Sequence, residues 1–157
     1  MIGDSNLKLI ENEKLKGRIP KNWTINCIPG ANLSLINKLL LELPKKTPML
    51  TDIIISAGMC DNNNSSPHLA TTLNTAISLK KRIHFQGIVI NDKILSEAQI
   101  KNLTKINNTA KQHASICYIK PPTSFSTTQD GIHYLAETVE RIFYSMKMHI
   151  QHFKSLN

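Results

Sequence analysis

The stretch TDIIISA, residues 51–57, is a nearly continuous run of apolar and β-branched residues. Such a run is typical of a strand that is buried on both faces of a parallel sheet, because helices cover both sides of these sheets. The polar stretch DNNNSS follows it at 61–66, and we expect a loop there. Residues 51–57 therefore predict an α/β fold.

Short apolar runs alternate with helical patterns on either side of this strand, as βα units require. Apolar residues recur at helical spacing after Gly30 and are expected to stop at Pro44, and Ser96 with Gln99 predicts a capping box at the start of a later helix. The other expected strands cover 23–28, 85–90 and 115–119, and further helices begin near Pro67 and extend over 135–153. We predict a parallel sheet of four or five strands with helices on both faces.

Polar and glycine residues follow several of these strands, at the edge where α/β proteins bind ligands. Ser5 comes directly after the apolar start of the chain, and Gly30 and the stretch GMCDNN at 58–63 follow later strands. Asp130 and His133 lie in the expected loop before the last helix. We therefore expect these residues to meet at one edge of the sheet.

A serine, a histidine and an aspartate that converge in this way can act together. The His133 imidazole would take the proton of the Ser5 hydroxyl, and Asp130 would accept a hydrogen bond from the other ring N–H and fix the tautomer. Ser5 could instead be only a helix N-cap, and Asp130 with Gly131 only a turn and a helix cap. The residues alone leave both readings open.

In their order along the chain, these motifs resemble the sequence blocks of the SGNH hydrolases of the GDSL type. Gly3-Asp4-Ser5 matches the first block, Gly30 the glycine of the second and Asp130-Gly131-Ile132-His133 the Asp-x-x-His of the last. Gly58-Met59-Cys60-Asp61 aligns with the Gly-x-Asn-Asp of the third. The resemblance spans nearly the whole chain, although each motif is short.

The resemblance implies a flavodoxin-like three-layer αβα fold and a serine esterase. It would hydrolyse small acyl, acetyl-type or lipid esters through an acyl-serine intermediate, without metal or organic cofactor. Ser5, His133 and Asp130 would be the catalytic residues, and the oxyanion donors would be Ser5, Gly30 and the residue at position 60. Cys60 departs from the family asparagine, and a thiol is a weak donor, so Asn62 or Asn63 is expected to supply the amide instead.

The short apolar start is a second departure, and we expect residues 1–157 to be a single domain excised from a longer protein. Within the superfamily, the small size and the Asn- and Lys-rich composition look most similar to the esterase domain in the first open-reading-frame protein of LINE retrotransposons. That resemblance implies a parent protein that works with nucleic acid and membranes. It also implies self-association through segments outside this chain.

The charge and cysteine content add expectations about partners and compartment. A formal charge of +8 favours approach to nucleic acid or an anionic membrane, so the alternative function is a non-catalytic module that binds RNA or anionic lipid through its basic surface. Three widely spaced cysteines suggest no disulfide framework, which favours a reducing, cytoplasmic location. The remaining histidines show no metal-ligand pattern and are expected at the surface, namely His68, His84, His113, His149 and His152.

Overall fold

The computed structural model describes residues 1–11, 13–46, 49–61 and 66–155. Five strands form one sheet in the order β2-β1-β3-β4-β5, and every neighbouring pair is parallel. This is the flavodoxin-like strand order, so the predicted fold class is confirmed. The strands are β1 (Ile2–Gly3), β2 (Asn26–Cys27), β3 (Asp52–Ser56), β4 (Arg82–Gln86) and β5 (Ile116–Ile119).

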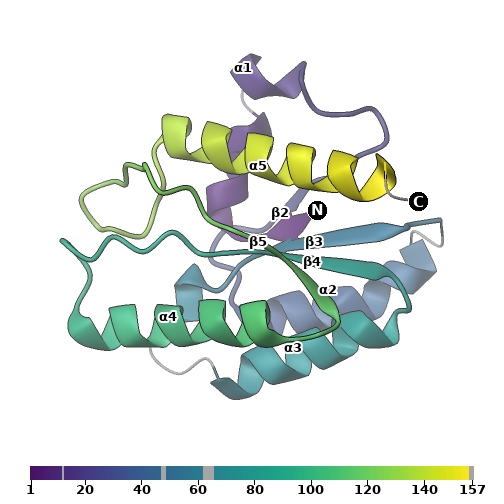
Figure 1. Ribbon diagram of the computed structural model, residues 1–157, viewed down its shortest axis with the longest axis horizontal. Coiled ribbons are helices and arrows are strands. Elements are labelled where there is room, and N and C mark those ends of the chain that lie inside the picture. The colour runs from purple at the N-terminus through teal and green to yellow at the C-terminus, as the bar shows by residue number, and fades with distance from the viewer. Residues whose placement is uncertain (12, 47–48, 62–65, 156–157) are drawn as a thin grey trace.

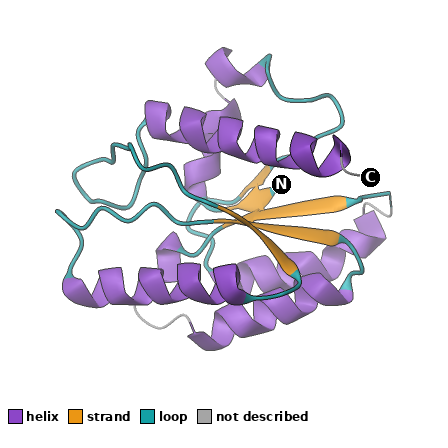
Figure 2. Ribbon diagram, viewed as in Figure 1, coloured by secondary structure: helices purple, strands orange, loops and turns teal. Residues whose placement is uncertain are grey.

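Helices cover both faces of the sheet, which makes three layers (Figures 1 and 2). One face carries the 3-10 helix η1 (Ser5–Glu11), α1 (Glu13–Lys16) and the long α5 (Ala136–Ser155). The other face carries α2 (Leu33–Lys46), α3 (Ser66–Ser78) and α4 (Glu97–Gln112), and a short 3-10 helix, η2 (Met59–Asp61), follows β3. None of the helices in the described part of the chain is long and apolar enough to cross a membrane.

The central strand and one helix cap agree closely with the sequence. Ile53, Ile54 and Ile55 of β3 are all buried, as a strand covered on both faces requires. At the start of α4, Gln99 N donates to Ser96 Oγ and Ser96 N donates to Gln99 Oε1. The predicted capping box is therefore present.

The predicted strand at 85–90 is displaced, because β4 begins at Arg82 and ends at Gln86. Beyond Gln86 the backbone bonds to side chains: Ile88 N donates to Asn107 Oδ1 at 2.8 Å, and Val89 N donates to the Tyr134 hydroxyl at 3.0 Å. These side chains come from α4 and from the loop before α5. Their hydrogen bonds replace the backbone hydrogen bonds that a neighbouring strand would supply. Apolar residues beyond β4 are buried without being in a strand.

Three other expectations need correction. The strand expected at 23–28 is reduced to Asn26–Cys27, and α2 extends to Lys46, past Pro44. A proline so close to the end of a helix removes one backbone donor, which the remaining hydrogen bonds of the last turns tolerate. His84 was expected at the surface, yet its side chain is 0% exposed, because it lies on the inner strand β4 against His149 and Phe153 of α5.

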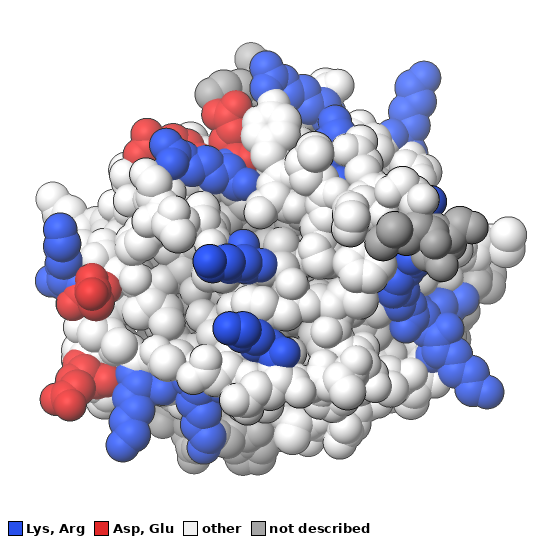
Figure 3. Space-filling view, in the orientation of Figure 1, with Lys and Arg blue, Asp and Glu red and all other residues white. Residues whose placement is uncertain are grey.

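Charged side chains are distributed unevenly over the viewed face (Figure 3). In this orientation Asp and Glu lie in the half that holds the loop before α5, whereas the half that holds the end of α5 shows Lys and Arg without Asp or Glu. On this face, Asp and Glu therefore lie toward the carboxyl ends of the strands, whereas Lys and Arg lie on both sides.

Candidate active site

Strand β1 holds Ser5 at the carboxyl edge of the sheet. Gly3 pairs with Cys27 of β2 and Ser56 of β3, and a Cβ atom at position 3 would lie 2.1 Å from the carbonyl oxygen of Ser56. Only glycine therefore fits between the two neighbouring strands. Asp4 N donates to Ser56 O at 3.1 Å, so the backbone is fixed up to the residue before Ser5, which begins η1 and is half-buried.

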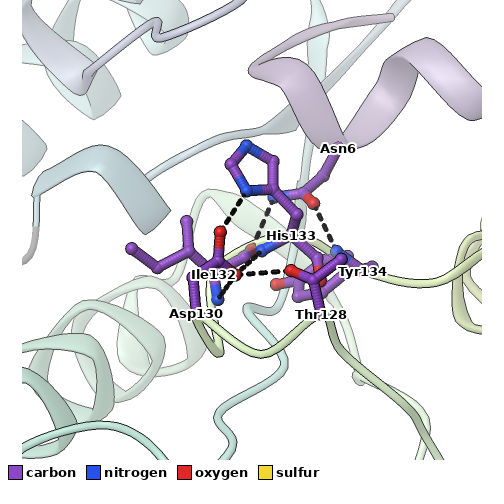
Figure 4. A network of polar contacts seen from close by, with 6 residues as sticks. All are labelled: Asn6, Thr128, Asp130, Ile132, His133 and Tyr134. Atoms are coloured by element: carbon purple, nitrogen blue, oxygen red, sulfur yellow. Dashed lines mark hydrogen bonds and ion pairs between the residues drawn. The ribbon is translucent and has the colours of Figure 1, made fainter.

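Asp130 and His133 form a hydrogen-bonded pair in the loop before α5 (Figure 4). His133 Nδ1 lies 2.7 Å from Asp130 Oδ2, and both side chains are about half exposed, at 53% and 44%. Because the carboxylate can only accept, Nδ1 carries the proton and Nε2 is left as an acceptor. Figure 4 shows that this second nitrogen points away from Asp130, as a general base requires.

The other oxygen of Asp130 is held by its own loop. Thr128 Oγ1 donates to Asp130 Oδ1 at 2.5 Å, and the backbone N–H groups of Ile132 and His133 donate to the same oxygen at 2.8 and 3.1 Å. The hydrogen bonds from Thr128 and from the His133 imidazole hold the pKa of Asp130 well below its usual value. Asp130 is therefore a charged acceptor at any pH near neutrality.

Asn6 joins the Ser5 segment to the His133 loop. Tyr134 N donates to Asn6 Oδ1 at 2.9 Å, and Asn6 Nδ2 donates to Ile132 O at 3.3 Å. These bonds place the segment after Ser5 beside the His133 loop. The meeting of the Ser5 hydroxyl with the imidazole stays a prediction, because among the described residues no hydrogen bond joins Ser5 Oγ to the ring. Catalytic hydrogen bonds of this kind are often long without substrate and shorten when it binds.

Asp4 is buried directly beside Ser5. Only 3% of it is exposed, and burial raises its pKa to about 6, against the hydrogen bonds from Asn6 and the opposing charge of His133. The Asp4 carboxyl is therefore within electrostatic reach of the imidazole. At neutral pH it carries a charge that is stabilised mainly by Asn6.

The structure describes some of the predicted oxyanion donors, Gly30 and Cys60 among them, but not Asn62. Gly30 follows β2 with φ +70°, a conformation that favours glycine, and it is exposed. Cys60 lies on η2 and is exposed as a residue. Partial burial of its thiol, together with the charges of Asp4 and Asp61, raises the pKa of that thiol to about 11. It is thus a neutral thiol, and Asn62, the alternative donor, lies outside the described residues together with Asn63.

Two supporting roles were not predicted from the sequence, those of Thr128 and Asp61. Thr128 holds Asp130, and Asp61 accepts a hydrogen bond from Leu33 N at 2.7 Å, which caps the start of α2 just beyond Gly30. The Thr-x-Asp spacing was a signal for the first. Nothing local signals the second, since its partner lies 28 residues away.

The opposite edge of the sheet holds a second histidine–carboxylate pair. His84 Nε2 lies 3.0 Å from Asp52 Oδ1, and a cavity of about 330 Å³ nearby is lined by residues that include Asp52, Trp23 and Ile150. Within the described ranges, no cluster of three or more His, Cys, Asp or Glu side chains could hold a metal ion. Asp52 begins β3, whereas Ser5 follows the end of β1, so this pair lies at the other edge of the sheet from Ser5.

Comparison with solved structures supports the architecture. The C-terminal catalytic domain of peptidoglycan O-acetyltransferase A (OatA) from Streptococcus pneumoniae, solved with a methylsulfonyl adduct, superposes with a TM-score of 0.76 over 98% of this chain and 92% of that chain. The fold is that of the SGNH hydrolases. Sequence identity to that domain is 13%, and no family model and no curated protein matches the chain.

Proposed function

We propose that the protein cleaves small acyl esters, acetyl esters first among them, through an acyl-serine intermediate. The observation that carries this proposal is the His133–Asp130 pair, which leaves His133 Nε2 free on the edge of the sheet where β1 delivers Ser5. The shared fold with an acetyl-transferring domain supports the same class of chemistry. No step of the proposed reaction uses a cofactor.

The proposed reaction has two halves. His133 Nε2 takes the proton of Ser5 as its oxygen attacks the ester carbonyl, and the tetrahedral oxyanion is held by the backbone N–H groups of Ser5 and Gly30. The carbon–oxygen bond to the alcohol then breaks, and the alcohol leaves with the proton from His133. A water or a second alcohol attacks the acyl-serine by the same route, which releases the acid or a new ester.

Two measurements test this function. Hydrolysis of p-nitrophenyl acetate is expected to fall by a factor on the order of a thousand or more in Ser5→Ala. A fluorophosphonate probe is expected to add one mass increment to the wild type and none to Ser5→Ala. Equal hydrolysis by the two proteins, or labelling elsewhere, would contradict the proposal.

The acceptor can be identified in the same assay. Hydrolysis alone releases acetate, whereas transfer to an added alcohol or to an oligosaccharide yields an acetylated product that mass spectrometry detects. We expect acetate release as the main path, since Ser5 is half-buried and water reaches it. A dominant acetylated product would instead assign the protein as a transferase.

A second candidate function is a non-catalytic module that binds RNA or anionic lipid. Cys60 in place of the amide donor and the basic half of the viewed face favour it (Figure 3). Salt-sensitive binding to RNA or to acidic vesicles, unchanged in Ser5→Ala and without turnover, would support this function. The resemblance to LINE retrotransposon proteins, self-association and the reducing location stay predictions.

A further inference from the structure

The side chain of Asn6 is nearly buried, with 7% of the residue exposed, in a place where an amide must find partners. Burying an unpaired amide is costly, and Asn6 avoids this by bonding both of its polar atoms. Its partners are the carbonyl of Ile132 and the N–H of Tyr134, which are the residues on either side of His133 (Figure 4). The amide therefore spans the backbone of His133.

Asn6 is equally well fixed to the other half of the site. Its backbone N–H donates to Asp4 Oδ1 at 3.0 Å, which closes a turn around Ser5. Asp4 is in turn held by its backbone bond to Ser56 of β3. Ser5 thus lies between two residues whose positions are set by the sheet and by the His133 loop.

The Asp130–His133 pair does not depend on Asn6. Its contacts come from within its own loop, where Thr128 Oγ1 and two backbone N–H groups hold one oxygen of Asp130 and Nδ1 of His133 meets the other. Thr128 N also donates to His133 O at 2.8 Å. Removing the Asn6 side chain therefore leaves the contacts within the pair in place and releases the pair from its fixed distance to Ser5.

We propose that Asn6 is a positioning residue that sets the separation of the Ser5 hydroxyl from the His133 imidazole. This inference rests on the proposed function. Only a side chain with a donor and an acceptor at one end makes both bonds: aspartate keeps the acceptor for Tyr134 N and loses the donor to Ile132 O, and leucine loses both. A misplacement on the order of 1 Å between reacting groups costs about a hundred-fold in rate.

The test uses Asn6→Leu with a matched control, Asn107→Leu. Asn107 on α4 makes a similar two-bond contact, in which its Oδ1 accepts from Ile88 N and its Nδ2 donates to Ile88 O. We expect Asn6→Leu to lower kcat for p-nitrophenyl acetate by about 30- to 100-fold with KM changed less than about three-fold. Both variants lose two hydrogen bonds, so we expect Asn107→Leu to lower the Tm about as much as Asn6→Leu does. Asn107→Leu should leave kcat within about two-fold.

NMR of the His133 ring distinguishes a positioning role of Asn6 from a general loss of structure around the Asp130–His133 pair. The ¹⁵N shifts of the His133 ring report its tautomer, and we expect the tautomer with the proton on Nδ1 to persist in Asn6→Leu, while the rate of fluorophosphonate labelling at Ser5 falls with kcat. Asn6→Asp, which keeps one of the two bonds, is expected to lose about ten-fold in kcat and serves if Asn6→Leu does not fold.

The proposal is overturned if Asn6→Leu or Asn6→Asp keeps the wild-type kcat, or if Asn107→Leu loses as much kcat as Asn6→Leu. A change of the His133 tautomer in the Asn6 variants would also overturn it, since the pair itself would then depend on Asn6. Failure of the proposed function gives a different result, in which Ser5→Ala and His133→Gln turn over substrate like the wild type.

Discussion

Within the described residues, two histidine–carboxylate pairs of similar geometry lie at opposite edges of one sheet. The nitrogen–oxygen distance is 2.7 Å for His133–Asp130 and 3.0 Å for His84–Asp52. Their surroundings differ, because the side chains of the first pair are 53% and 44% exposed and those of the second 0% and 13%. Hydrogen bonding to a carboxylate therefore does not by itself distinguish a catalytic histidine from a structural one.

The difference lies in what surrounds the second ring nitrogen. Nδ1 of His84 is buried and has no hydrogen-bond partner among the described residues, and the ring packs against His149 and Phe153 of α5. Burial lowers the pKa of His84 in spite of the Asp52 carboxylate, which also holds Arg82 at 2.8 Å. A proton on Nδ1 would have no acceptor there, whereas Nε2 of His133 faces the open edge beside the Ser5 segment.

Exchanging each histidine for glutamine is expected to produce the largest contrast. His133→Gln removes the proposed general base and should lower kcat for p-nitrophenyl acetate by a factor of about a thousand or more. His84→Gln should leave kcat within about three-fold and lower the Tm instead. A large loss of kcat in His84→Gln, with little loss in His133→Gln, would contradict this assignment of the two histidines.

Removing the partly buried Asp52 carboxylate tests the difference in stability between the two pairs. Asp52→Ala leaves the His84 N–H and the Arg82 guanidinium without their acceptor and should lower the free energy of unfolding by about 3 kcal/mol, measured with urea. The control Asp92→Ala removes an exposed carboxylate in the loop after β4 and should change stability by less than about 0.5 kcal/mol. Equal effects of the two substitutions would mean that the buried pair contributes no net stability.

Cys60→Asn tests whether the exposed edge is a complete site. The amide would replace a neutral thiol as a donor at the third oxyanion position, and we expect kcat to rise by about ten-fold or more. Cys60→Ser, which supplies a hydroxyl on a shorter side chain, is the control and should change kcat less. A fall in kcat with asparagine would show that the thiol side chain is itself suited to the substrate.

The smallest expected effect is the pH dependence of the buried pair. Because the folded-state pKa of His84 is lowered, the unfolded chain binds more protons below its ordinary pKa of about 6.5, and stability falls as the pH drops through that range. Asp4, with a raised pKa of about 6, contributes the opposite slope between about pH 4 and 6. The difference in unfolding free energy between wild type and His84→Phe cancels the Asp4 term and should shrink as the pH falls from 7 to 5. A difference that does not change with pH would mean that His84 keeps its ordinary pKa.

The sequence predicted those features of the fold that depend on residues close together along the chain. The buried run at 51–57, the capping box at Ser96 and the placement of Ser5 after β1 depend on residues within a few positions of one another. The burial of His84 and the two bonds of Asn6 were not predictable in this way, because their partners lie in segments far along the chain. The early end of β4 has the same cause, since Asn107 and Tyr134 take over its backbone groups.

The two-residue strand β1 has a consequence for the order of assembly. It is held by β2 and β3, and the loop it must meet lies more than 120 residues further on. During synthesis the hydroxyl of Ser5 leaves the ribosome early and has no base until the loop at 127–134 has emerged and docked. If the proposed function holds, a polypeptide truncated before this loop is expected to be inert toward esters.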